Sequence, residues 1–215
     1  MKGAWAGEIG MVQMLPGDIL ERGVDGDGDG LVTLKTSVPD ALLSGARMLQ
    51  HHGWRAGEPW LQEIVLPETF DWSLTGLDEA MPVEQWAAMG VQLRQGMLPM
   101  GLPASVLLPQ GRNGPAFLVF RNYDAAYAYN GADSYALAIS LLCDRLRGRP
   151  GVQGDWPTDD LPLSREQRRE LQRLLRDEDT PIEMRFAGNQ ARFNFSNMEF
   201  VTKLVEGKFP DRKST

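Results

Sequence analysis

A short acidic run near the start of the chain has the residue types and spacing of a metal-binding loop. Asp25, Asp27 and Asp29 alternate with glycines, and Leu31 and Val32 follow. In calcium-binding loops the first, third and fifth positions supply side-chain oxygens, the sixth is a glycine at a sharp turn, and the seventh gives a backbone carbonyl. The pattern predicts that the three aspartates and the carbonyl of Leu31 bind one Ca²⁺ ion, with Val32 pointing inward.

The end of this loop departs from the pattern. Its twelfth position is Thr36, where a complete loop has a glutamate that binds the ion through both carboxylate oxygens. The last ligand must therefore come from elsewhere in the chain or from water, and Asp40 is the nearest candidate. The alternative is an acidic, glycine-rich turn that binds no ion.

A helix is needed to place Asp40 beside the loop. Pro39 suits the first helical position, Asp40 gives the first turn an acidic residue, and Gly53 fits the end. These signals predict a helix of about 14 residues, an ordinary length for a globular protein.

Residues 61–120 show a different pattern. Prolines and glycines separate short apolar runs at 64–66, 105–108 and 117–120, which predicts short strands and loops, with one small helix near 83–89.

The next segment, residues 133–147, is apolar on nearly every side. This pattern predicts a helix buried in the centre of the domain. Cys143, the single cysteine, lies in this segment and is expected to be a core thiol.

The C-terminal part begins with a linker over residues 148–162, which are rich in Gly, Pro and Asp. Ser164 opens a capping box that predicts an amphipathic helix through Leu175. Alternating residues on both sides of Gly188-Asn189 predict a β-hairpin, followed by a third strand at 198–205. The predicted fold is therefore α+β, with one domain over 1–150, a linker and helix over 151–179, and short antiparallel strands over 180–215.

Composition and charge limit the functions that are open to the chain. Its 215 residues include 42% hydrophobic residues and six tryptophans, which fits a packed core. A net charge of −7 disfavours general binding to nucleic acid or to anionic membranes. No segment reaches the roughly 18 apolar residues of a membrane helix, and the start lacks a signal-peptide layout, so the chain as written is expected in the cytoplasm.

Several motifs, found in the same order, resemble the B-type lytic murein transglycosylases, which cut the glycan strands of peptidoglycan. The similar segments lie at 2–16, 24–30, 37–42, 52–54 and 121–138. The resemblance covers residues 2–148 and implies part of a lysozyme-like catalytic domain. It also implies a place in the periplasm or cell envelope.

In the resembled family, one glutamic acid in an apolar cleft stays protonated and donates its proton to the bridging oxygen between N-acetylmuramic acid and N-acetylglucosamine. The C6 hydroxyl of the sugar then attacks the anomeric carbon and gives a 1,6-anhydro product, so a second carboxylate is not required. This glutamate precedes the Gly-Ala-Trp-Ala-Gly segment at 3–7, and we expect it to be absent from this chain. Glu8 is expected to be an ordinary loop carboxylate, so no catalytic residue is assigned.

The resemblance also implies which residues contact the sugars. They are Gln13, Tyr129, Asn130 and Tyr135, whose amides and phenols make directed hydrogen bonds while aromatic faces pack on pyranose rings. The alternative for the two tyrosines is ordinary packing against their helices. If the helices that cover 133–147 are missing, an apolar face on the order of several hundred Å² is exposed and solubility is low.

A second resemblance covers only residues 181–211, which are similar to a piece of the bacterial DNA polymerase sliding clamp. The helix at 164–175 further resembles the first helix of a small peptidoglycan-binding module.

The first hypothesis for function is a lytic transglycosylase-type protein that acts on peptidoglycan glycan strands, as a truncated and impaired chimera. The alternatives are a non-catalytic peptidoglycan-binding module and a replication-related clamp fragment, although binding to DNA is disfavoured because so short a tail cannot close a ring.

Overall fold

The acidic loop lies between two helices at the N-terminal end of the structure. This structure is a computed structural model, and it describes residues 7–78, 80–157, 164–166, 169, 173, 183–187 and 190–194. Helix α1 spans Pro16–Arg22 and helix α2 spans Val38–His51. The Ser37 side chain accepts the N–H of Asp40 and caps α2, so the helix predicted from Pro39 is confirmed.

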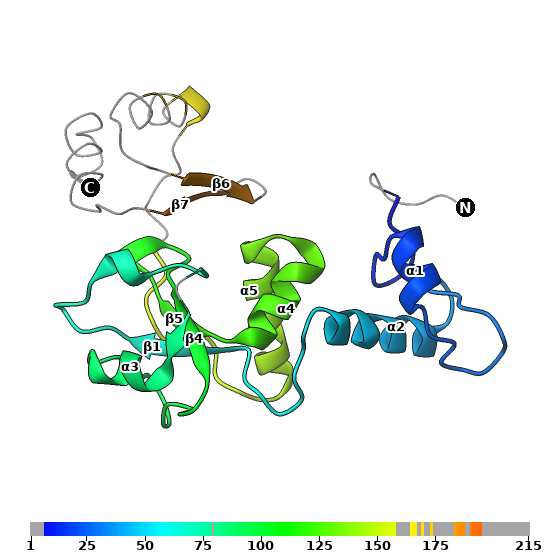
Figure 1. The fold of residues 1–215 in the computed structure, drawn as a ribbon, viewed down its shortest axis with the longest axis horizontal. Coiled ribbons are helices and arrows are strands. Elements are labelled where there is room, and N and C mark those ends of the chain that lie inside the picture. Colours follow the sequence, from blue (N-terminus) through cyan, green and yellow to red (C-terminus); the bar gives the residue numbers. More distant parts are fainter. Residues whose placement is uncertain are drawn as a thin grey trace.

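An antiparallel sheet occupies the middle of the chain (Figure 1). Its five strands lie in the order β2-β4-β5-β1-β3. Their bounds are Leu61–Val65 for β1, Met81–Pro82 for β2, Gln92–Leu93 for β3, Pro103–Leu107 for β4 and Ala116–Val119 for β5. Helix α3 (Val83–Ala88) follows β2, and single 3-10 turns lie at Trp72–Leu74 and Gly111–Asn113. The three predicted strand regions and the small helix are confirmed.

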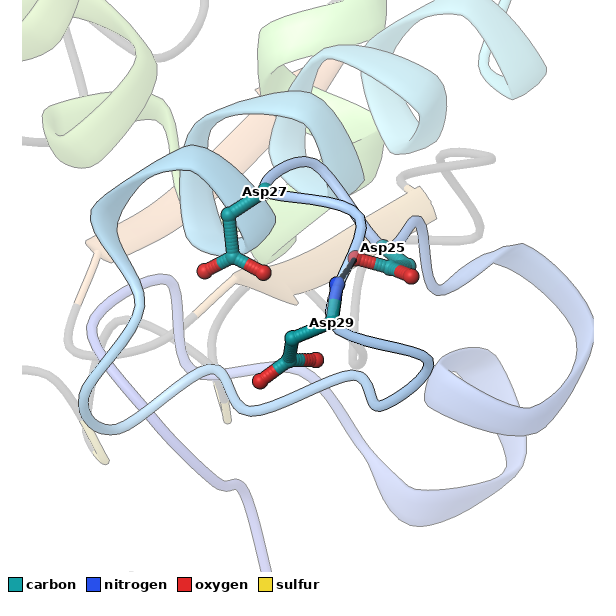
Figure 2. Close-up of side chains that lie close together, drawn as sticks. All are labelled: Asp25, Asp27 and Asp29. Atoms are coloured by element: carbon teal, nitrogen blue, oxygen red, sulfur yellow. Dashed lines mark hydrogen bonds between the residues drawn. The ribbon is translucent and has the colours of Figure 1, made fainter.

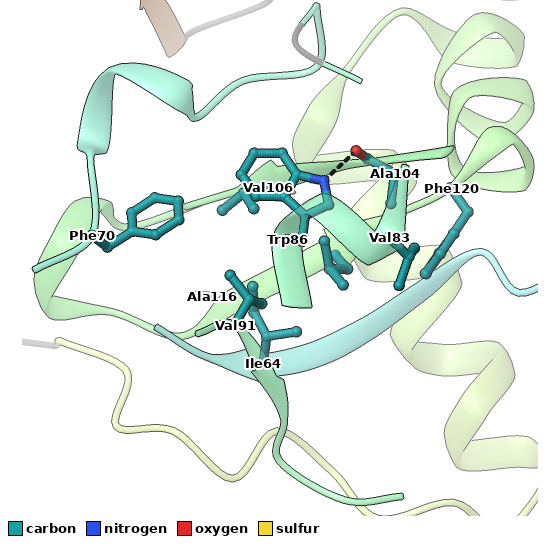
Figure 3. Close-up of a cluster of buried hydrophobic side chains, with 10 residues drawn as sticks. Ile64, Phe70, Val83, Trp86, Val91, Ala104, Val106, Ala116 and Phe120 are labelled. Atoms are coloured by element: carbon teal, nitrogen blue, oxygen red, sulfur yellow. Dashed lines mark hydrogen bonds between the residues drawn. The ribbon is translucent and has the colours of Figure 1, made fainter. Parts of the chain in front are cut away.

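The sheet is covered on both faces. All four residues of β5 are buried, and alternate residues face opposite sides because side chains in a strand alternate with a period of two. Ala116 and Leu118 join a core around Trp86, whereas Phe117 and Val119 join a second core with Tyr123. In the first core, Trp86 is fully buried and its ring nitrogen donates to the carbonyl of Ala104 at 2.8 Å (Figure 3).

Two helices, α4 (Arg121–Asn130) and α5 (Asp133–Leu146), complete the second core. The chain turns between them at Gly131, whose φ is 69°. Asn122 is fully buried near the start of α4. Its side chain accepts the N–H of Arg55 at 2.7 Å and donates to the carbonyls of Arg55 and Glu58, at 2.8 Å each. One amide therefore holds the loop that connects α2 to the sheet.

Helix α5 differs from the prediction. It forms where expected, but only Ala136, Leu137, Ser140 and Asp144 are buried, so it is not a central helix. The opposite face exposes a stripe of large apolar side chains, namely Tyr135, Ile139, Leu142 and Leu146. Cys143 is also exposed, and the prediction of a core thiol is wrong. The apolar residues of α5 are more numerous than the positions that α4 and the sheet can cover.

Near the C-terminus, the predicted hairpin is confirmed by β6 (Glu183–Ala187) and β7 (Gln190–Asn194), which pair antiparallel with Ala187 opposite Gln190. The third strand at 198–205, and most of the helix predicted to begin at Ser164, lie outside the described residues. Among the residues that are described, no helix combines the length and apolar character that crossing a bilayer requires.

Replacing Trp86 with Phe tests the core on the α3 side of the sheet. The change removes the hydrogen bond to the Ala104 carbonyl and leaves a gap, and we expect a loss of about 2 to 4 kcal/mol in the free energy of unfolding. Urea unfolding followed by circular dichroism measures this loss. Trp156→Phe is the matched control because Trp156 is 40% exposed, and equal losses in the two variants would contradict the assignment.

Candidate functional site

The three aspartates of the acidic loop lie together on its exposed side (Figure 2). One carboxylate oxygen from each of Asp25, Asp27 and Asp29 lies within 4.8 Å of the other two. One Asp25 oxygen accepts the N–H groups of Gly28 and Asp29, at 2.6 and 3.2 Å, and the other accepts the N–H of Gly30 at 2.8 Å. The backbone of the loop therefore curves around the carboxylate of Asp25.

Asp40 has a different place from the other three carboxylates. It is fully buried, and its two oxygens accept the N–H of Gly26 at 2.8 Å and the N–H of Thr33 at 2.7 Å. The N–H of Thr33, followed by that of Gly26, lowers the pKa of the Asp40 carboxyl below its ordinary value. Asp40 lies outside the group of three close carboxylates and ties together the two ends of the loop.

Two serines of the same helix region add further contacts to the loop. The Ser37 hydroxyl donates to an Asp27 oxygen at 2.6 Å. The buried Ser44 hydroxyl accepts the N–H of Val24 at 2.9 Å. The N-cap and the first half of α2 therefore hold the loop at its entry, its middle and its exit.

The chemistry of this loop fits a hard cation. Its donors are all oxygens, and three negative charges in close proximity repel one another unless a cation compensates them. Gly28 and Gly30 adopt φ values of 78° and 88°, which glycine reaches without strain. Leu31 is exposed, and its N–H donates to Asp29 at 2.8 Å. The role of its carbonyl as a ligand stays a prediction.

The residues predicted to contact sugars come from three separate elements. Gln13 lies in a tight turn in which Ile9 and Met14 exchange backbone hydrogen bonds of 2.8 and 3.2 Å. Its φ is 50°, and its side-chain amide donates to the carbonyl of Gly10 at 2.6 Å. Gln13 itself is exposed. The turn therefore presents this side chain at the surface in a fixed backbone conformation.

Tyr129 connects this turn to helix α4. Its hydroxyl donates to the carbonyl of Val12 at 2.5 Å, directly beside Gln13. Burial, followed by the nearby Tyr135 and Asp18, raises the pKa of Tyr129 to about 12, so the phenol stays a neutral donor at physiological pH. The structure thus brings Gln13 and Tyr129 together, and it gives Tyr129 a packing role in addition to the predicted sugar contact.

Tyr135 and Asn130 lie on either side of the turn between α4 and α5. Asn130 is the last residue of α4 and is exposed, and Tyr135 is 39% exposed in the first turns of α5. His52, which the sequence reasoning did not assign, lies with its ring 6.4 Å from that of Tyr129. Burial, and then the charge of His51, lowers the pKa of His52. The sequence signal for it was the His-Gly-Trp motif at 52–54.

A hollow of about 270 Å³ lies between β1 and the segment after α5. Glu63 and Arg94 pair there at 3.0 Å, and Arg149 pairs with Asp144 at 3.0 Å. Burial raises the pKa of Asp144, and Arg149 opposes the effect. No sequence pattern indicates this hollow, because its lining residues come from β1, β5, the residues after β3, helix α5 and the segment that follows α5.

Comparisons with known proteins place the chain in a family. A family model described as the transglycosylase SLT domain matches residues 1–144. Membrane-bound lytic murein transglycosylase B of Escherichia coli K12 is 31% identical over 146 residues, which are 66% of this chain and 38% of that protein.

The solved structures that are similar to the chain include SltB3 and Slt35. SltB3 of Pseudomonas aeruginosa, solved with NAG-anhNAM-pentapeptide, has a TM-score of 0.78 and 46% identity over 83% of this chain and 49% of its own. The Escherichia coli lytic transglycosylase Slt35, solved with calcium, has a TM-score of 0.57 and 27% identity over 68% of this chain and 46% of its own. The chain therefore spans about half the length of these solved relatives.

The similarity to the sliding clamp is short. The β sliding clamp of Staphylococcus epidermidis is 40% identical over 42 residues, which are 20% of this chain and 11% of the clamp. So small a part of the clamp supports no function for the chain.

The buried Asp40 carboxylate predicts a pH dependence of stability. Because its pKa is lowered by folding, Asp40 stabilises the protein above its ordinary pKa of about 3.9, and this contribution is lost as the pH falls through the lower folded value. We expect Asp40→Asn to lower the melting temperature at pH 7 and to make melting less sensitive to pH as the pH falls below about 4. Thermal melts with a chelator present measure both effects. The exposed Asp78→Asn is the control, and a wild-type pH profile in Asp40→Asn would contradict the role.

Proposed function

Because the chain belongs to the transglycosylase SLT domain family, we propose that it carries the glycan-binding part of a peptidoglycan lytic transglycosylase. Such an enzyme cleaves the β-1,4 bond between N-acetylmuramic acid and N-acetylglucosamine and forms the 1,6-anhydro sugar. The observation that carries the proposal is the hydrogen bond from Tyr129 to the Val12 carbonyl, which holds the turn with the exposed Gln13 next to helix α4. The 46% identity to SltB3, a protein solved with a NAG-anhNAM peptide, supports it.

In this proposal each residue has a distinct part in holding the glycan. The Gln13 amide and the exposed face of Tyr135 contact the sugar, the first by hydrogen bonds and the second by packing on a pyranose ring. Asn130 adds a further amide at the end of α4. Tyr129 is half-buried, and its neutral hydroxyl fixes the Gln13 turn through the Val12 carbonyl.

Binding and cleavage are separate requirements in this scheme. Cleavage needs a carboxylic acid that protonates the bridging oxygen, and we assign none among residues 7–157. Glycan binding needs only the residues assigned above. The activity of a whole transglycosylase therefore requires a proton donor in addition to them, and we place its action in the cell envelope, where peptidoglycan lies.

We further propose that Asp25, Asp27, Asp29 and the carbonyl of Leu31 hold a Ca²⁺ ion with a structural role. The cluster of three carboxylates and the calcium complex of Slt35 support this assignment. When bound, the ion neutralises the repulsion among the carboxylates. Asp40, which ties Gly26 to Thr33, keeps the loop in a shape that suits the ion.

Glycan binding can be measured with purified peptidoglycan strands freed of peptide. We expect the wild-type chain to bind them, and Tyr135→Ala to weaken binding about tenfold through loss of the ring contact. Leu146→Ala is the matched control, because Leu146 belongs to the same exposed stripe about three helical turns away. No retention of the wild-type chain, or equal weakening in both variants, would remove the proposal.

Calcium binding can be measured by isothermal titration calorimetry and thermal melts. Ca²⁺ at 100 times its dissociation constant stabilises the folded protein by about 2.7 kcal/mol, so the melting temperature rises. Asp29→Ala is expected to abolish both the binding heat and the rise. Asp155→Ala, an exposed aspartate outside the loop, keeps both. A rise in melting temperature that persists in Asp29→Ala would place the ion elsewhere.

A further inference from the structure

The exit of the acidic loop runs directly into the support of the Gln13 turn. Thr33 is held by Asp40, and the next residue, Leu34, is only 3% exposed. The Leu34 carbonyl accepts the N–H of Met11 at 2.9 Å. Gly10 approaches Leu34 so closely that a Cβ atom there would lie 2.4 Å from the Leu34 Cβ. The turn that presents Gln13 is therefore built against the end of the loop.

A small hydrophobic core contains residues of the Gln13 turn, the loop exit and helices α2 and α4. Met14, Leu34 and Met48 are its buried members, and Val12 and Tyr129 pack against it. The Tyr129 hydroxyl, which comes from helix α4, donates to the Val12 carbonyl of the turn. The Gln13 turn thus has two supports, the loop exit at Leu34 and helix α4 at Tyr129.

We propose that the acidic loop positions Gln13, so that Ca²⁺ in the loop raises glycan affinity without touching the glycan. This inference rests on the proposed function. Without a cation, repulsion among Asp25, Asp27 and Asp29 loosens the loop, and the loss of order reaches Leu34 because Asp40 ties Thr33 to the loop entry. The hydrogen bond from Met11 to Leu34 weakens, and Gln13 samples conformations that do not bind sugar. Gln13 is then the contact through which the ion acts.

Glycan affinities of three proteins, each measured with and without calcium, test whether the ion acts through Gln13. Affinity for peptide-free glycan strands is measured with Ca²⁺ and with EDTA in the wild-type chain, in Gln13→Asn and in Tyr135→Ala. Asn tolerates the positive φ of residue 13 while shortening the amide. We expect EDTA to weaken wild-type binding about tenfold, which corresponds to about 1.4 kcal/mol. The same loss is expected in Tyr135→Ala, and little or none in Gln13→Asn.

Amide hydrogen exchange gives a second readout that does not involve glycan. The N–H of Met11, bonded to Leu34, is expected to exchange at least several-fold more slowly with Ca²⁺ than with EDTA. The N–H of Phe120, bonded to the Trp60 carbonyl at 3.0 Å in the sheet region, is the control and is expected to exchange equally in both.

The outcomes separate the two proposals. If the wild-type chain binds no glycan in Ca²⁺, the proposed function fails. If it binds glycan but EDTA has no effect, or weakens Gln13→Asn as much as Tyr135→Ala, the positioning of Gln13 by the loop is wrong. Faster exchange of Met11 and Phe120 alike in EDTA would show general loss of structure, and would also overturn it.

Discussion

The buried carboxylate of Asp40 is the constraint on which the N-terminal part depends. Its two oxygens bind the N–H groups of Gly26 and Thr33, on either side of three exposed aspartates. A buried charge is tolerated only where hydrogen bonds compensate the loss of water, and here backbone donors supply them. Asp40 lies in the first turn of helix α2, where its N–H donates to the Ser37 cap. The start of the helix and the shape of the acidic loop therefore depend on the same residue.

The sheet depends on a different constraint, which is burial on both faces. Strand β5 divides its residues between the core of Trp86 and the core of Tyr123, so neither layer can be removed without exposing it. Asn122 connects this region to the chain that arrives from α2. The stripe of apolar side chains on α5 has no such cover among the described residues.

Local signals predicted much of the secondary structure. Pro39 and Asp40 supply the rigid first turn and the acidic residue that begin α2. The strands of the sheet follow apolar runs between prolines and glycines. Helix α1 was not predicted because it is short. A helix was expected around Tyr129, but the bounds of α4 were not predicted, because α4 is rich in alanine and polar residues with little apolar periodicity. The burial of α5 was overestimated, since composition shows that a helix is apolar but not what lies against it.

The sequence by itself determined the family resemblance and the acidic loop, because the spacing of three aspartates and glycines is a local property of the chain. The resemblance also predicted which amide and phenol residues contact sugar, and these contacts stay a prediction. Only the tertiary structure decided that Asp40 lies behind the loop, that Tyr129 binds the Val12 carbonyl, and that the Gln13 turn rests on Leu34. Apart from the Asp40 contacts, these hydrogen bonds link residues up to 117 positions apart in the sequence. No local pattern encodes which distant backbone groups meet when α2 and α4 pack against each other.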